Sequence, residues 1–217
     1  MLKPELYNPA TVIQKAGHAS LVETQTGEWY AVHLSSRPIL PQKRCILGRE
    51  TSIQKMAWTS DGWIRMEDGS NLAKDFVSEP KIAETPFPPL PEYDDFDKEQ
   101  LAIFYNSPRN PITPDWASLV RRKSWLALRG RETLTSAYTP SIVARRLTAM
   151  QAQVTTKMDF HPETYLQTAG LTCYYDNEDY FCIYKSYDED RGSLVLGIEG
   201  FSNGTLVETE LEPIDIP

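Results

Sequence analysis

The chain has 217 residues, of which 41% are apolar, 11% aromatic and 24% charged. This is enough apolar material for a hydrophobic core, which excludes a mainly disordered chain, and the length suits one or two domains. The net charge of −8 excludes binding to duplex nucleic acid by charge attraction, and no apolar run approaches the ~18 residues of a membrane span.

The first 79 residues predict two β-hairpins. The expected strands span residues 18–24, 28–34, 49–58 and 63–66. The first pair is joined by turn residues at 25–27, and the second by Ser60-Asp61-Gly62. An Asp-Gly dipeptide between β-rich runs is a strong hairpin signal. Two hairpins give four strands, which is the content of one propeller blade.

The clearest change of composition lies at residues 80–91, PKIAETPFPPLP, where five of twelve residues are proline. Proline fixes φ and lacks the backbone N–H, so this stretch is excluded as a helix or a central strand. It indicates an extended, semi-rigid connector. We therefore divide the chain into a domain at 1–79, a linker at 80–91 and a domain at 92–217.

The second domain also predicts short strands, which favour an antiparallel β-sandwich. The expected strands lie within 143–160 and at 171–175, 180–184, 194–198 and 205–211. The last two flank a turn at Asn203-Gly204. No closing element is expected after Leu211, so the sandwich is predicted to be truncated at its C-terminus.

Three cysteines, Cys45, Cys173 and Cys182, are too few and too scattered for a disulfide framework. Cys173 and Cys182 flank a predicted hairpin turn, where a disulfide is the alternative to two small buried thiols in a reducing compartment, which we favour. No Cys/His spacing indicates zinc. The first residues lack an apolar signal segment, and we expect a cytoplasmic protein.

Two residues are the main candidates for chemistry. His18, in Gly17-His18-Ala19-Ser20, could ligate a metal, orient a carboxylate or touch a substrate. Arg49, in Gly48-Arg49-Glu50, carries a planar charged fork suited to carboxylates or adjacent hydroxyls, and strand alternation would turn it away from Glu50. Taken alone, the residues favour a hydrogen-bonded core histidine and a surface ion pair.

Weaker candidates have structural explanations. Asn203-Gly204-Thr205 matches a glycosylation sequon, but the hairpin turn explains it better. Five tryptophans could stack on sugars, although packing between strands explains each of them equally well. They are Trp29, Trp58, Trp63, Trp116 and Trp125.

Longer segments carry a resemblance to a known family. GHASLVETQTGEWYAVHLSSRP and RCILGRETSIQKMAWTSDGWIRM resemble the end of the catalytic domain of glycoside hydrolase family 43 β-xylosidases. PFPPLPEYDDFD and LRGRETLTSAYTPSIVARR are similar to the same family, and MDFHPETYLQTAGLTCYYDNEDYF resembles its C-terminal concanavalin A-like β-sandwich. The resemblance covers essentially the whole chain. It implies an all-β protein, with the last blade of a five-bladed β-propeller followed by that sandwich, both incomplete.

The family removes xylose from the non-reducing ends of xylo-oligosaccharides with inversion, with α-L-arabinofuranosidase as a side activity. The resemblance implies three catalytic carboxylates, which come from blades that this chain lacks. No catalytic residue is therefore assigned here, and neither Glu23 nor Glu50 is promoted to that role. Two carboxyl groups facing each other across a water are what inverting hydrolysis requires.

The resemblance assigns two substrate-binding residues and reverses the preference reached from the residues alone. Arg49 matches the family arginine that lines the sugar subsite and contacts the catalytic carboxylates. His18 matches the histidine at the propeller axis, where some relatives hold a hydrated calcium or other divalent ion. No cofactor is otherwise required.

The sequence therefore predicts a fragment of a xylan 1,4-β-xylosidase that is inactive alone. It would act on xylo-oligosaccharides, need the missing blades in cis or in trans, and assemble as a homo-oligomer, with no nucleic-acid or membrane partner. The alternatives are a non-catalytic carbohydrate-binding or assembly module and a truncated, non-functional product.

Overall fold

The computed structural model describes residues 8–207 and 214–216. Every regular element in these residues is a β-strand, which confirms the all-β prediction. Within the same residues, no helix is long and apolar enough to cross a membrane.

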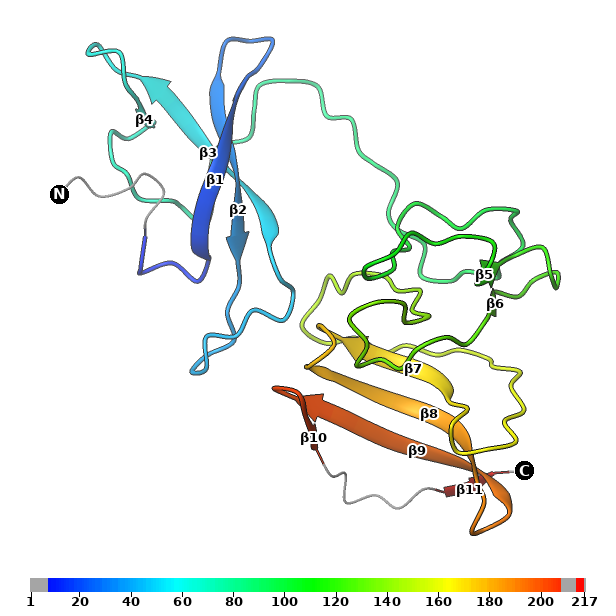
Figure 1. Ribbon diagram of the computed structural model, residues 1–217. Helices are drawn as coiled ribbons and strands as arrows, with labels where there is room; N and C mark the ends of the chain where they lie inside the picture. The colour runs from blue at the N-terminus through cyan, green and yellow to red at the C-terminus, as the bar shows by residue number, and fades with distance from the viewer. Residues whose placement is uncertain (1–7, 208–213, 217) are drawn as a thin grey trace. The chain divides into compact units, whose positions relative to one another are not determined.

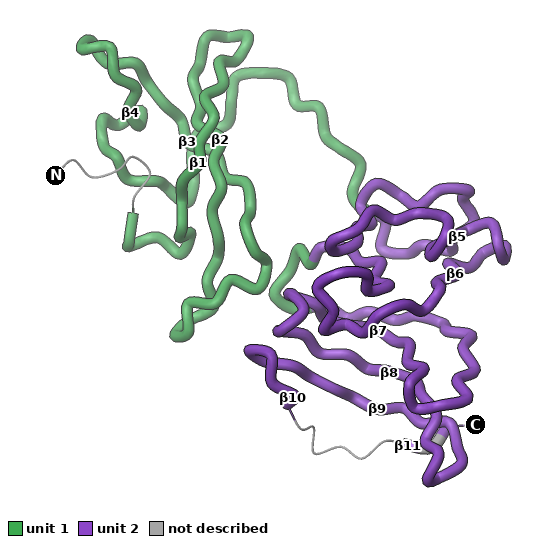
Figure 2. The backbone as a smooth tube through the Cα atoms, viewed as in Figure 1, with its two compact units in different colours: residues 1–90, 147–151 green, residues 91–146, 152–217 purple. Residues whose placement is uncertain are grey.

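The chain forms two compact units (Figure 2). Unit 1 comprises residues 1–90 and 147–151, and unit 2 comprises residues 91–146 and 152–217. The proline-rich residues 82–91 form neither strand nor helix, and their side chains are exposed. The predicted domain limits stay a prediction.

Unit 1 contains an antiparallel sheet whose strands follow in chain order, β1-β2-β3-β4 (Figure 1). The strands are β1 Gln14–Glu23, β2 Trp29–Ser36, β3 Glu50–Trp58 and β4 Ile64–Met66. Both predicted hairpins are confirmed, although β1 begins at Gln14 and not at His18. Gly27 and Gly62 close the two turns with φ of 77° and 81°, a left-handed backbone that glycine adopts readily.

One face of this sheet is buried. Ala31 of β2, Met56 of β3 and Met66 of β4 form a core cluster with Ala73, which follows the sheet. Met56 lies directly opposite Met66 across the β3–β4 ladder. Because side chains alternate between the faces of a strand, this cluster determines which face of the sheet turns inward.

Residues 72–81, here called the strap, have no strand partner and are held by side chains of the sheet and of Glu28, which directly precedes β2. Three side chains bond the strap backbone: Gln54 to Lys74, Tyr30 to Ser78, and Glu28 to Lys81. The Lys81 amide, together with the Lys55 ammonium, holds the pKa of Glu28 below its usual range. The start of the proline-rich segment is thereby fixed to unit 1.

Unit 2 contains an antiparallel sheet in the order β10-β9-β8-β7, with β11 also paired to β9 (Figure 1). Its strands are β7 Ala169–Tyr174, β8 Tyr180–Asp188, β9 Ser193–Ser202, β10 Thr205–Val207 and β11 Ile214–Ile216. A separate short pair is formed by β5 Ala117–Ser118 and β6 Ala127–Leu128. Both predicted hairpins are confirmed to residue 207, and residues 208–211 lie outside the described part of the chain.

Two expectations for the second predicted domain, residues 92–217, are wrong. Residues 143–160 form no strand, and only Ala144 makes a bridge, to Asn106. The apolar residues there are unevenly spaced, and Leu147 and Val154 are 42% and 65% exposed. No face of this segment is buried, so nothing imposes the two-residue period of a strand.

The sheet also has a closing strand that the sequence prediction lacked. β11 pairs antiparallel with β9, with Ile214 opposite Leu196 and Ile216 opposite Leu194. The sequence Ile-Asp-Ile alternates with the period of a strand, but three residues are too short to be recognised without their partner.

The register of β7 and β8 places the two hairpin cysteines on opposite faces of the sheet. Cys182 is opposite Thr172, whereas Cys173 is opposite Phe181. Both thiols are free, as predicted. The expectation that both are buried holds for Cys182 and is wrong for Cys173, which is exposed. Burial raises the pKa of the Cys182 thiol to about 11.

Replacing Gln54 with leucine is expected to lower the free energy of unfolding of unit 1 by about 1–3 kcal/mol, because the Lys74 N–H and C=O lose their side-chain partner. Urea denaturation followed by hydrogen exchange of the β2 and β3 amides measures this change. Gln25→Leu, at an exposed turn position, is the matched control. Equal stability of the two variants would show that the strap does not depend on Gln54.

Replacing Gly170 with alanine is expected to destabilise unit 2 by about 1–3 kcal/mol or more. A β-carbon at Gly170 would lie 1.9 Å from the backbone oxygen of Ile183. Gly130→Ala is the control, since a β-carbon there meets nothing within 4 Å, and its effect should stay within about 0.5 kcal/mol. Hydrogen exchange of the β7 and β8 amides distinguishes them, and similar protection in both variants would contradict the close approach.

Candidate functional site

The two predicted binding residues, His18 and Arg49, both lie in unit 1. His18 occupies an irregularity of the β1–β2 register, between the pairs Gly17–Leu34 and Ser20–Val32. Its φ of 54° is left-handed, and its side chain is exposed. A bulge of this kind changes the direction of a side chain, so the imidazole is not the packed core histidine that the residues alone suggested.

Arg49 immediately precedes β3, and its backbone is well anchored. Gly48 has a left-handed φ of 68°, and its carbonyl accepts a hydrogen bond of 2.8 Å from the Ser36 hydroxyl. Leu47, one residue earlier, is only 5% exposed. The Arg49 side chain is exposed, and no described residue pairs with its guanidinium group.

The neighbouring carboxylate is already bound to another arginine. Arg37 donates from Nε to Glu50 Oε2 at 2.9 Å and from Nη2 to Glu50 Oε1 at 2.7 Å. These bonds lower the pKa of Glu50 and raise that of Arg37. Glu50 is thus engaged by Arg37. The surface ion pair that the residues alone favoured for Arg49 is not found among the described residues.

The register brings His18 and Arg49 to the same end of the sheet. Leu34 of β2 is opposite Gly17 on one side and opposite Thr51 on the other. Strand β2 therefore lies between Gly17 and Thr51. Their backbones are two strand spacings apart, or about 10 Å. Within the described residues, neither hydrogen bond nor ion pair joins His18 and Arg49.

The described residues do not by themselves form a metal site. No group of three or more His, Cys, Asp or Glu side chains in this part of the chain is placed to hold an ion. The divalent ion expected near His18 would find a single imidazole here. We therefore derive no chemical step through it.

The sequence analysis missed a row of polar groups on the buried side of the same sheet. His33 is 2% exposed; its Nδ1 lies 2.9 Å from the Leu34 carbonyl oxygen, and its Nε2 is buried without a partner. The Ser35 and Ser52 hydroxyls are 2.6 Å apart across β2 and β3. Polar residues in a strand ordinarily indicate its solvent face, so the sequence offers no signal for this row.

Two families match the sequence of the chain. The family described as "Beta xylosidase C-terminal Concanavalin A-like domain" matches residues 93–216, which is more than half of the chain. The family described as "Glycosyl hydrolases family 43" matches residues 2–64.

Individual relatives agree with both matches. A β-xylosidase of Bacillus subtilis (strain 168) is 39% identical over 198 residues, which cover 87% of this chain and 37% of that protein. A xylan 1,3-β-xylosidase of Vibrio sp is 37% identical over 202 residues, with coverage of 88% and 37%.

A solved structure shows the same fold. The crystal structure of a xylan β-1,4-xylosidase from Bacillus halodurans C-125 superposes with a TM-score of 0.86 at 43% identity. The superposition covers 96% of this chain and 40% of that one. The chain thus spans only 37–40% of the length of these proteins. It belongs to glycoside hydrolase family 43 and covers the C-terminal part of the enzymes of that family.

Proposed function

We propose that the chain serves as the C-terminal part of an inverting xylan 1,4-β-xylosidase, which removes xylose from the non-reducing ends of xylo-oligosaccharides. The observation that carries the proposal is the exposed, unpaired guanidinium group of Arg49 among the described residues. Its backbone is anchored at the end of β3, its guanidinium is exposed, and it has no partner in the described residues. Arg49 also stands where the family resemblance expects the arginine of the sugar subsite.

The chemistry of arginine suits this role. A guanidinium group stays charged at any relevant pH and presents N–H donors in a planar fork. The fork can donate to two adjacent sugar hydroxyls, or to a carboxylate that takes part in the reaction. His18, exposed at the same end of the sheet, would contribute a second polar contact to the substrate.

Hydrolysis itself requires a carboxylic acid and a carboxylate on opposite sides of the glycosidic bond. We assign neither to this chain, and Glu50 is bound to Arg37. The proposal therefore includes the propeller blades of the family, supplied in cis or in trans. A cytoplasmic location and a homo-oligomeric assembly belong to it as predictions.

The purified chain is expected not to hydrolyse 4-nitrophenyl β-D-xyloside, because it lacks the acid and the base. Release of nitrophenol, compared with buffer and with the Bacillus subtilis β-xylosidase, measures this. Turnover that follows the chain through purification would contradict the proposal.

A chimera tests Arg49 directly. The part of the Bacillus subtilis β-xylosidase that this chain does not cover is joined to the chain, and activity is expected to return. Arg49→Ala should then lower kcat/KM by about 10²–10³-fold, because a charged donor to the sugar and the carboxylates is lost.

Arg121→Ala is the control for this chimera, since Arg121 is an exposed arginine in unit 2. Circular dichroism verifies that each variant folds. An active chimera in which Arg49→Ala and Arg121→Ala have equal rates would remove Arg49 from the sugar subsite.

A further inference from the structure

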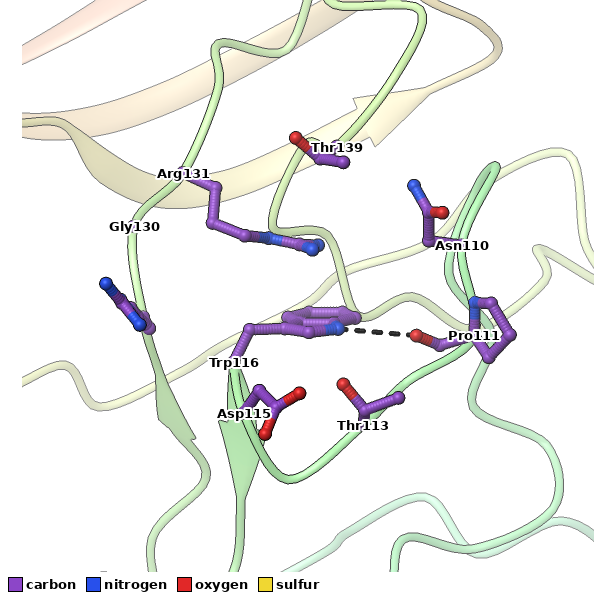
Figure 3. Close-up of a pocket in the computed structure, with 9 residues that line it drawn as sticks. Asn110, Pro111, Thr113, Asp115, Trp116, Gly130, Arg131 and Thr139 are labelled. Atoms are coloured by element: carbon purple, nitrogen blue, oxygen red, sulfur yellow. Dashed lines mark hydrogen bonds between the residues drawn. The ribbon is translucent and has the colours of Figure 1, made fainter.

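Unit 2 contains a pocket of about 580 Å³ beside the β5–β6 pair (Figure 3). Pockets that hold small molecules have volumes of roughly 300–1,000 Å³. Its lining comes from two segments of the chain, one before β5 and one after β6. The pairing of Ala117 with Leu128, and a 2.7 Å hydrogen bond from Arg129 N to the Trp116 carbonyl, hold these segments side by side.

One wall of the pocket is fixed by Trp116 and Arg131. Trp116 is 3% exposed, and its indole N–H donates to the Pro111 carbonyl at 3.3 Å. The Arg131 guanidinium lies 4.3 Å from the centroid of the indole ring and donates to Ser141 Oγ and to the Pro140 carbonyl. These contacts use two of its five N–H donors and hold the rest in a set orientation.

Charges of both signs line the pocket without pairing. Asp115 and Arg129 are exposed, and neither their carboxylate nor their guanidinium group has a partner among the described residues. Figure 3 shows Asp115 and Thr113 on the side of the indole ring away from Arg131. Asn110 donates its amide N–H to the Tyr138 carbonyl, which leaves its side-chain oxygen as an acceptor.

We propose that this pocket binds the adjacent hydroxyl groups of a neutral sugar, a pyranose unit of an oligosaccharide. A hydroxyl both donates and accepts, so a diol can accept from Arg129 while it donates to Asp115. Planar carboxylate and guanidinium groups each match two neighbouring oxygens. The site goes beyond the proposed hydrolysis, because it lies in unit 2 and uses neither Arg49 nor His18.

The charges of the lining disfavour other ligands. A phosphate would be drawn to the two arginines but would meet the Asp115 carboxylate, and a metal ion would meet two positive charges. The buried indole of Trp116 exposes too little of its face to bind a sugar by stacking alone. Of these modes of binding, the lining best suits hydrogen bonds to the hydroxyl groups of a sugar.

The experiment is a titration of the full chain with xylobiose, followed by two-dimensional ¹H–¹⁵N NMR. A saturable shift of the Trp116 indole N–H signal is expected. Asp115→Asn and Arg129→Gln should each weaken binding by about tenfold or more, because each removes a charged hydrogen-bonding partner of the diol. Both side chains are exposed and unpaired, so neither substitution disturbs a contact of the described fold.

Asp190→Asn and Arg121→Gln are matched controls at exposed positions, and both should bind like the unchanged chain. Arg49→Ala should also bind normally, which separates this site from the proposed hydrolytic one. Absence of a saturable shift at the highest attainable sugar concentration would overturn the proposal. Tighter binding of inorganic phosphate than of xylobiose, strengthened by Asp115→Asn, would equally overturn it by identifying an anion site.

Discussion

The pairing of the Gln54 carboxamide with the backbone of Lys74 is the interaction on which unit 1 depends. The strap has no strand partner, and buried backbone N–H and C=O groups must be satisfied by some other group. Gln54 is 2% exposed and supplies one acceptor and one donor, at 3.0 and 2.9 Å. This bond positions the strap so that Ala73 completes the cluster of Ala31, Met56 and Met66. Without it, one face of a small sheet would turn its apolar side chains toward water.

Polar side chains that have partners within the fold have a structural role, whereas those without partners are available to a ligand. Glu50 binds Arg37, which leaves the adjacent Arg49 free. In unit 2 the guanidinium of Arg131 is held by backbone, hydroxyl and ring contacts, whereas that of Arg129 has no described partner. An exposed guanidinium retains its hydration, so leaving it unpaired costs the fold little. Each candidate ligand-binding arginine therefore lies near another arginine that has a structural role: Arg49 near Arg37, and Arg129 near Arg131.

The hairpins could be predicted because their signals are local: Asp-Gly and Asn-Gly turns flanked by β-rich runs. The strand expected within 143–160 was wrong because its apolar residues have no regular period, and β11 was missed because it exists only against β9. For the site, the resemblance gave the positions of His18 and Arg49 but not their surroundings. The Arg37–Glu50 bond and the pocket around Trp116 both join residues that are distant in the chain, and no local pattern encodes such contacts.

The second face of the unit 1 sheet connects stability with the proposed activity. Val22, Val32 and Ile53 share that face, because Val32 is opposite Ile53 and Val22 is opposite Tyr30, two residues before Val32. Val22 and Ile53 are 45% and 39% exposed.

Blades of a propeller pack face to face, and burying apolar surface contributes about 25 cal/mol per Å². Under the proposed function, the blades that would cover Val22 and Ile53 are also the source of the carboxylates that Arg49 would contact. Folding of the sheet against those blades and completion of the active site would then be one event, in which the exposed Arg49 guanidinium at the end of the sheet would meet the carboxylates.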